Sequence, residues 1–150
     1  MITLIVGASG GIGAAICQLA LADEKVSRLL ATSRDPDSLP THDKLVPIAL
    51  DLCSTQSITN AVAAVRENAS HIDCLIMASG YLHDTHKSPE KALRELDGAT
   101  LQNVLQINAV GPMLVFAALE PLLKQATAPK VLFLSAQVGS IGDNRLGGWY

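Results

Sequence analysis

Short runs of apolar residues alternate along the chain with longer segments in which apolar side chains recur every three or four positions. The apolar runs predict buried β-strands at residues 2–6, 28–32, 45–50, 73–78 and 130–135. The two clearest helical segments follow the first and third runs, and their apolar faces hold Ile12, Ile16, Leu19 and Ala20, and then Ile58, Val62 and Val65. A regular alternation of strands and helices favours a parallel sheet with right-handed crossovers. The predicted fold class is therefore α/β, with a doubly wound parallel sheet between two layers of helices.

Two further helices are predicted between the fourth and fifth apolar runs. Residues 88–90, Ser-Pro-Glu, form a typical helix start, with an N-cap side chain, a proline in the first position and an acid near the positive end of the helix dipole. A second helix is expected from about residue 100 to residue 123, bent or broken at Pro112. The longest apolar stretch within it, 110–119, is too short to span a bilayer, so we predict no membrane segment.

Composition and charge limit the kinds of molecule that this protein is expected to bind. The 150 residues suit one domain with a real core, since 49% of them are hydrophobic and only 17% are charged. Lys and Arg number 11 against 14 Asp and Glu, without a basic cluster, and aromatic residues make up 3%, so nucleic acid is not an expected partner. Three cysteines without a paired spacing, and an apolar start that lacks a basic n-region, indicate a cytoplasmic protein. His83 and His86 lie in a polar loop without a third ligand nearby, so no metal site is predicted.

The sequence Gly-Ala-Ser-Gly-Gly-Ile-Gly at residues 7–13 lies where the first strand should end and the first helix should begin. Glycines at such a junction allow a tight turn and a close approach of the backbone to a phosphate, and the helix N-terminus adds free N–H donors. No Lys-Ser or Lys-Thr pair follows the glycines, so the loop is not the P-loop of nucleoside-triphosphate hydrolases. We therefore predict that this loop binds a pyrophosphate.

The spacing Gly7-x-x-x-Gly11-x-Gly13 resembles the short-chain dehydrogenase/reductase family rather than the dehydrogenases with a G-x-G-x-x-G sequence. The resemblance implies a Rossmann-type fold, a nicotinamide dinucleotide as cofactor, and hydride transfer between the nicotinamide and a small carbonyl or alcohol substrate. It implies that the pyrophosphate is held by Gly7, Ser9, Gly10, Gly11 and Ile12. It further implies adenine contacts for Asp51 and Leu52. Met-Ala-Ser-Gly at residues 77–80 occupies the place of the family's Asn-Asn-Ala-Gly, so the nicotinamide ribose should lie along Ala78 and Gly80.

The end of the second apolar run bears on which of the two nicotinamide dinucleotides is bound. The ribose 2′ position is read there, by an acid for NAD or by a cation for NADP. Arg34 offers a planar donor fork to a 2′-phosphate, and Ser33 offers a second donor. Asp35 follows directly, and an ordinary surface ion pair with Arg34 is the alternative. We favour NADP over NAD as the cofactor.

The resemblance extends to the catalytic residues of the family. Asn108 matches the helix asparagine that anchors a proton-relay water, and Ser135 lies at the end of the fifth run, where the catalytic serine is expected. Ala136 occupies the position of the serine that related sequences usually use, which leaves Ser140 as another candidate. The family's proton donor is the tyrosine of Tyr-x-x-x-Lys, and no lysine follows Tyr150 at that spacing. Either Tyr150 or a tyrosine beyond it would be the acid, and this chain alone should be inactive.

The last residues indicate a subgroup and an incomplete fold. Residues 138–145, followed by Gly-Gly-Trp-Tyr at 147–150, resemble the C-factor-like and sniffer-like reductases of this family. A strand–helix–strand unit takes roughly 30 residues, so the chain holds about five strands, and we expect the N-terminal part of a longer NADP-dependent reductase. The resemblance also implies a homo-oligomer, formed through the helix that begins near residue 100. The alternative is a non-catalytic dinucleotide-binding protein, a signalling or regulatory protein resembling C-factor.

Overall fold

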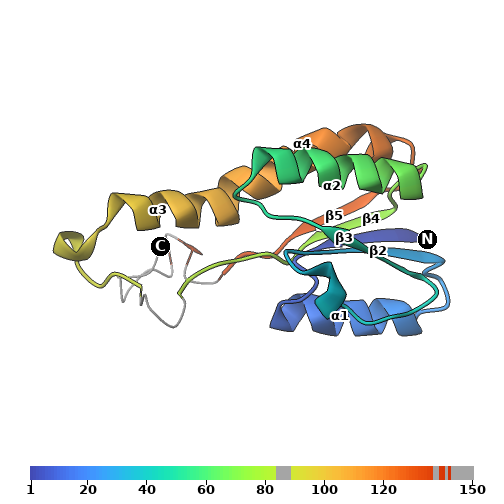
Figure 1. Ribbon diagram of the computed structural model, residues 1–150, viewed down its shortest axis with the longest axis horizontal. Helices are drawn as coiled ribbons and strands as arrows, with labels where there is room; N and C mark the ends of the chain where they lie inside the picture. The colour runs from blue at the N-terminus through green and yellow to red at the C-terminus, as the bar shows by residue number, and fades with distance from the viewer. Residues whose placement is uncertain (84–88, 137–138, 141, 143–150) are drawn as a thin grey trace.

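The computed structural model describes residues 1–83, 89–136, 139, 140 and 142, and its centre is a five-stranded sheet (Figure 1). The strands occupy the predicted apolar runs and are β1 (Ile2–Val6), β2 (Arg28–Ser33), β3 (Leu45–Ala49), β4 (Cys74–Met77) and β5 (Lys130–Phe133). Their order across the sheet is β3-β2-β1-β4-β5, and every neighbouring pair is parallel. The α/β fold class is therefore confirmed.

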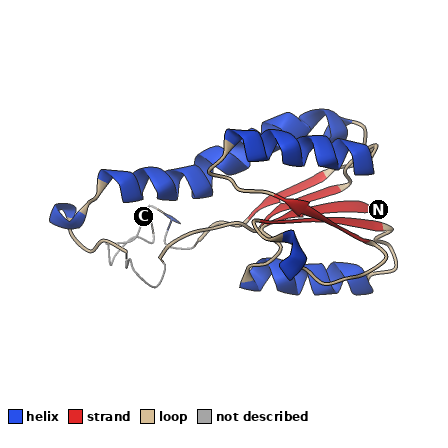
Figure 2. Cartoon of the chain, in the orientation of Figure 1, coloured by secondary structure: helices blue, strands red, loops and turns tan. Residues whose placement is uncertain are grey.

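The chain changes its direction across the sheet between β3 and β4. It moves outward from β1 through β2, a 3₁₀ turn at Pro36–Ser38 and β3, and then returns to place β4 on the other side of β1. Right-handed crossovers therefore put α1 (Gly11–Ala22) on one face of the sheet, and α2 (Thr55–Asn68) and α4 (Gly111–Lys124) on the other (Figures 1 and 2). This is the Rossmann-type doubly wound arrangement, in which ligands bind beyond the carboxyl ends of the strands at the point of reversal.

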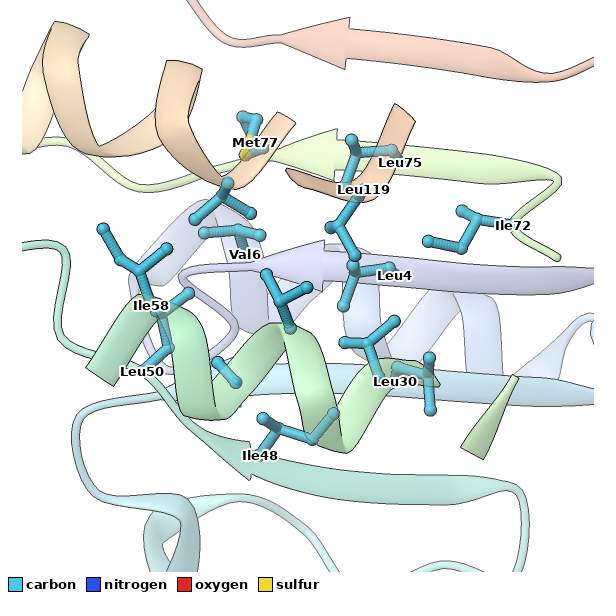
Figure 3. Close-up of a cluster of buried hydrophobic side chains, with 14 of the residues drawn as sticks. Leu4, Val6, Leu30, Ile48, Leu50, Ile58, Ile72, Leu75, Met77 and Leu119 are labelled. Atoms are coloured by element: carbon cyan, nitrogen blue, oxygen red, sulfur yellow. The ribbon is translucent and has the colours of Figure 1, made fainter. Parts of the chain in front are cut away.

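Side chains at successive strand positions point to opposite faces of the sheet and enter two separate cores. On the side of α2 and α4, Leu4 and Val6 of β1 pack in one buried cluster with Ile58 and Leu119 (Figure 3). Ile5, which lies between them in sequence, belongs to a smaller cluster under α1. Burial of each such side chain contributes about 1.5–3 kcal/mol. Strand β1 is therefore held from both faces, and its carboxyl end is a rigid support for the glycine loop.

The face of α1 that meets the sheet matches the predicted apolar face only in part, because Ile16 and Ala20 pack against the core cluster under α1. Ile12 and Leu19 are 63% and 71% exposed, whereas Gly13 and Cys17 are buried. The reason is the closeness of α1 to the preceding loop, because a Cβ atom at Gly13 would lie 2.1 Å from the carbonyl oxygen of Gly7. Helix α1 therefore packs against its own loop at Gly13, which has no side chain. Cys17 is buried one turn later on the same side of the helix.

No α-helix begins in residues 89–92, contrary to the prediction from Ser-Pro-Glu, whose first residue lies outside the described part of the chain. A 3₁₀ turn at Leu93–Glu95 follows, and the next helix is α3 (Gly98–Leu105). The carboxylate of Asp97 caps it, accepting hydrogen bonds from the backbone N–H of Thr100 at 2.9 Å and from its hydroxyl at 2.6 Å. The helix begins where one carboxylate can satisfy a first-turn N–H group that would otherwise lack a partner.

Helix α3 continues into α4 without a break, because a single π-turn at Gln106–Val110 joins them. The N–H of Gly111 bonds to the carbonyl of Gln106, five residues earlier, as is typical of a π-turn. Pro112 follows the π-turn directly. The helix is therefore not broken at Pro112, and a wider helical turn precedes the proline.

The continuous helix Gly98–Lys124 is long and apolar enough to cross a membrane by length and composition alone, which revises the expectation drawn from residues 110–119. In the fold its Val115, Leu119 and Leu123 are buried in the core that α2 and the sheet share. Burial against a sheet is typical of the helix layers of α/β proteins and accounts for these three side chains, whereas 28% of the most apolar 18-residue window of the helix is buried.

Candidate functional site

A cavity of about 500 Å³ lies beyond the carboxyl ends of β1, β2, β3 and β4. It stands at the point where the strand order reverses, which is where doubly wound sheets bind their ligands. Its walls come from the glycine loop, the segments that follow β2, β3 and β4, and the helix α3 with its π-turn. Of the predicted dinucleotide-binding residues, those that line it are Gly7, Ser9, Gly10, Arg34, Asp51, Leu52, Ala78 and Gly80.

Gly7 makes the turn that opens this cavity. Its φ angle of +86° is in the left-handed region that side chains disfavour, and a Cβ atom there would lie 2.7 Å from the backbone nitrogen of Ser79. The Gly7 N–H donates to the hydroxyl of Thr32 at 3.3 Å. Glycine at this position therefore lets the loop pass directly over the end of β4.

Gly10, Gly11 and Ile12 form the open N-terminus of α1. Gly10 is the N-cap and has no side-chain hydrogen bond to the helix, and the first turn contains no acid. A Cβ atom at Gly11 would meet nothing within 4 Å, so no protein contact there demands a glycine. Unsatisfied N–H groups, a positive dipole end and open space fit a phosphate group. Gly11 and Ile12 stand at this end rather than among the residues that line the cavity.

At the end of β2, Arg34 is exposed and lines the cavity, and within the described residues it forms no ion pair with Asp35. The alternative of a local ion pair is therefore not what the structure shows. Asp35 instead uses its backbone N–H to bond the hydroxyl of Ser33 at 3.1 Å. Among the described residues, none forms an ion pair with the guanidinium of Arg34, so it is available to a ligand.

Asp51 is anchored at the end of β3 by hydrogen bonds from both sides. Its N–H donates to the hydroxyl of Ser57 at 2.8 Å, and its carboxylate accepts the N–H of Cys53 at 2.9 Å. The next residue, Leu52, is buried, and its carbonyl accepts a hydrogen bond from the side chain of Gln106 at 2.7 Å. The segment that should contact adenine is thus fastened to the π-turn of the long helix.

Cys53 and Asn103 line the same end of the cavity, and the sequence patterns did not predict either of them. The Cys53 thiol lies 3.5 Å from the side-chain oxygen of Asn103. Partial burial raises the pKa of the Cys53 thiol, the neighbouring Asp51 carboxylate raises it further, and Arg34 opposes the rise. The group is therefore a neutral thiol at pH 7 and not an activated nucleophile. The only signal for Cys53 in the sequence was its position two residues after Asp51.

At the end of β4, the Asn108 side chain braces the turn beyond Gly80. Its amide oxygen accepts the N–H of Tyr81 at 2.8 Å, and its amide nitrogen donates to the Tyr81 carbonyl at 2.7 Å. Tyr81 lines the cavity, whereas Asn108, on the π-turn, is exposed and is not among the lining residues. The Asn108 side chain therefore holds the backbone of Tyr81, which is part of the cavity wall. Its role in anchoring a relay water stays a prediction.

The predicted catalytic serine lies apart from the cavity-lining residues. Ser135 follows β5 and is exposed, and Ser140 is exposed as well. The N–H of Gly139 donates to the carbonyl of Ala136 at 3.0 Å. Tyr150 is outside the described residues. The described structure therefore brings most of the predicted dinucleotide-binding residues to one cavity and leaves the choice of catalytic serine and tyrosine as predictions.

Comparison with known proteins agrees with this geometry. A family model described as short chain dehydrogenase matches residues 1–147. The chain belongs to this family. Curated relatives include the short-chain dehydrogenases srdF of Neurospora crassa, 31% identical over 153 residues, and RED3 of Pyricularia oryzae, 32% identical over 152 residues. These alignments cover 94% and 92% of this chain but only 58% and 57% of the relatives. The chain thus spans little more than half the length of the short-chain dehydrogenases that it matches.

Solved structures confirm the Rossmann-type fold of this chain. The Sniffer protein of Caenorhabditis elegans superposes with a TM-score of 0.87 at 24% identity, over 97% of this chain and 68% of that chain. The NADPH-bound carbonyl reductase from chicken fatty liver superposes with a TM-score of 0.83 at 25% identity, over 97% of this chain and 60% of that chain. The family is one of oxidoreductases that use nicotinamide dinucleotides, and the cavity lies where such a cofactor is held.

Proposed function

We propose that this chain is the dinucleotide-binding part of an NADP-dependent oxidoreductase that transfers hydride between the nicotinamide and a small carbonyl or alcohol substrate. In this proposal the open end of α1 binds the pyrophosphate, Arg34 binds the 2′-phosphate and Asp51 contacts adenine. The bound dinucleotide would supply the hydride. Ser135 would orient the substrate oxygen, with Ser140 as the other candidate, and the π-turn at Asn108 would anchor the relay water.

The guanidinium of Arg34 carries the choice of NADP over NAD. It stands at the end of β2, where the ribose 2′ position is read, and within the described residues it forms no ion pair with the neighbouring Asp35. A planar guanidinium matches a phosphate with two parallel hydrogen bonds, whereas a ribose hydroxyl gains less from it. Two proteins of the same fold support the choice, the NADPH-bound reductase from chicken fatty liver and a Burkholderia cenocepacia short chain dehydrogenase in complex with NADP.

A fluorescence titration with NADPH and NADH tests this proposal, on the wild type and on R34Q. Hydrogen bonds to a charged group contribute about 1.5–3 kcal/mol, so R34Q should weaken NADPH binding by about 10- to 150-fold and leave NADH binding nearly unchanged. R94Q is the matched control, because Arg94 is an exposed arginine that does not line the cavity. Tighter binding of NADH than NADPH by the wild type would contradict the choice of NADP. No saturable binding of either would contradict the proposed function.

A homo-oligomer and a cytoplasmic location complete the proposal. Apolar side chains form an exposed row along the long helix at Leu105, Val110, Met113 and Leu114, and a second copy of this helix would cover them. The three cysteines are free thiols, which suits a reducing compartment. The relatives named above are dehydrogenases and reductases, and no observation favours the non-catalytic alternative.

A further inference from the structure

Two serine hydroxyls meet where the glycine loop passes the end of β2. The Oγ atoms of Ser9 and Ser33 are 3.0 Å apart, and both residues line the cavity next to Arg34. Their environments differ, because Ser33 is only 5% exposed and Ser9 is exposed. One hydroxyl of the pair is therefore shielded from solvent, and the other is accessible to a ligand.

The hydrogen bonds of Ser33 determine what Ser9 can do. A serine hydroxyl has one proton to donate and two lone pairs with which to accept. Ser33 accepts the N–H of Asp35 at 3.1 Å and donates its own proton to Ser9. A buried hydroxyl needs an acceptor of this kind, and in the described part of the chain Ser9 provides it. With its proton directed to Ser9, Ser33 would have none left for a ligand, and Ser9 rather than Ser33 would be the second donor to the 2′-phosphate.

The proton of Ser9 is left free by this arrangement. Because Ser9 Oγ accepts from Ser33, its own O–H must point away from that bond. The cavity beside Arg34 then presents two groups that can donate, the Ser9 hydroxyl and the guanidinium. A phosphate has several strong acceptor oxygens and suits such a pair, whereas a ribose hydroxyl brings a proton of its own.

We propose that Ser33 is a positioning residue, which holds Ser9 as a hydrogen-bond donor beside Arg34 and so helps the site to select a 2′-phosphate. The proposal rests on the proposed function and deepens it. It assigns the Ser9 side chain to the 2′ side of the cofactor, at the end of β2, rather than to the pyrophosphate as the family resemblance implies. Ser33 itself would act only through Ser9.

A double-mutant cycle tests whether Ser33 acts through Ser9. NADPH and NADH, which differ in the 2′-phosphate, are titrated against the wild type, S9A, S33A and the double variant S9A/S33A. We expect S9A and S33A each to weaken NADPH binding by about three- to tenfold, and to change NADH binding by less than about twofold. The double variant should bind NADPH as S9A does, because without Ser9 the Ser33 hydroxyl has nothing to position.

Two further variants separate positioning from a structural role. S33T keeps the hydroxyl and should restore most of the preference for NADPH. S38A removes a serine that bonds the carbonyl of Asp35 outside the cavity, and it should leave binding of both dinucleotides unchanged. A merely structural Ser33 would lower the melting temperature of the free protein and weaken both dinucleotides by the same factor.

The outcomes distinguish this inference from the proposed function beneath it. Selective loss of NADPH binding in S33A, absent in the S9A background, would support the inference. Equal loss for the two dinucleotides, an unchanged S33A, or a further loss when S33A is added to S9A would overturn it and leave NADP binding intact. A wild type that binds neither dinucleotide would contradict the proposed function and this inference together.

Discussion

Gly11 and Gly13 lie two residues apart at the start of α1, and their surroundings are opposite. At Gly13 a Cβ atom would lie 2.1 Å from the carbonyl oxygen of Gly7, so the backbone itself excludes a side chain. At Gly11 a Cβ atom would meet nothing within 4 Å. The first glycine is therefore free of any packing requirement in the protein, and the second is required by the packing of α1 against its own loop.

The two positions should respond differently to alanine. Because the carbonyl of Gly7 cannot move without the turn, G13A should lower the free energy of unfolding by about 3 kcal/mol, at the upper end of overpacking effects. G11A should leave it unchanged or raise it by up to about 1 kcal/mol, since alanine is the better helix former. Urea unfolding of the free protein measures both values.

G11A also tests the phosphate site at this end of the helix. Its methyl group would occupy space that the pyrophosphate needs, so NADPH binding should weaken roughly tenfold in a protein that is no less stable. Unchanged NADPH affinity in G11A would mean that the open space at Gly11 is not the phosphate site.

The π-turn between α3 and α4 is the element that ties the two walls of the cavity together. Gln106, at its start, bonds the carbonyl of Leu52 on the adenine side. Asn108, two residues later, bonds both backbone groups of Tyr81 on the opposite side. A wider turn at this point lets one helix hold two loops that are far apart in sequence. Such turns are frequent at functional sites.

N108D tests this bracing. The variant keeps the oxygen that accepts from Tyr81 and replaces the donor with an oxygen that faces the Tyr81 carbonyl. Both bonds are exposed to solvent, so loss of the donor should cost about 0.5–1 kcal/mol of unfolding free energy at pH 7. The charged carboxylate is disfavoured there, so its pKa in the folded protein should rise above the unfolded value of about 3.9. The protonated acid regains a donor, and the deficit relative to wild type should therefore shrink as the pH falls toward 4.

The variant N60D is the control for the pH dependence of N108D. Asn60 is an exposed helix residue whose side-chain oxygen accepts from Gln56, a role that an aspartate can keep. N60D should stay within about 0.5 kcal/mol of the wild type. An N108D deficit that is absent at pH 7, or that grows as the pH falls, would show that Asn108 does not brace the turn.

Two apolar surfaces of the whole molecule remain uncovered in the described structure. One is the outer row of the long helix, where Val110 and Met113 are 46% and 53% exposed. The other is the edge strand β5, where Leu132 is 49% exposed. Phe133 of this strand packs edge-to-face against Phe116 of α4. Exposed apolar surfaces of this kind mark association sites, and an unpaired strand edge is a second route to association.

Charge substitutions distinguish the two surfaces. The proposed homo-oligomer uses the helix, so M113E should convert the protein to a monomer by sedimentation equilibrium, while L132K should leave the assembly unchanged. Desolvating one glutamate at such an interface costs several kcal/mol, more than most dimers can lose. Dissociation by L132K and not by M113E would place the interface at β5 and contradict the helix proposal. A wild type that is monomeric at every concentration would contradict the homo-oligomer itself.

The sequence by itself determined the strands, their parallel arrangement and the place of the glycine loop. These follow from local causes, namely continuous apolar runs, helical spacing within Thr55–Asn68, and glycines at a strand-to-helix junction. The family resemblance also assigned Asp51 and Gly80 to the cofactor, and the charge of its side chain assigned Arg34. The three residues line one cavity, because each follows a strand of a parallel sheet and the carboxyl ends of those strands lie along one edge.

Only the tertiary structure decided how these parts are held and oriented. The buried face of α1 depends on a backbone contact at Gly13, the start of α3 depends on which acid reaches Thr100, and the course of the helix at Pro112 depends on a π-turn. The hydroxyl pair at the end of β2 joins residues 24 positions apart, and the Asn108 brace joins residues 27 positions apart. Such contacts leave no periodic trace in the chain, because they form only when packing brings separate segments within hydrogen-bond distance.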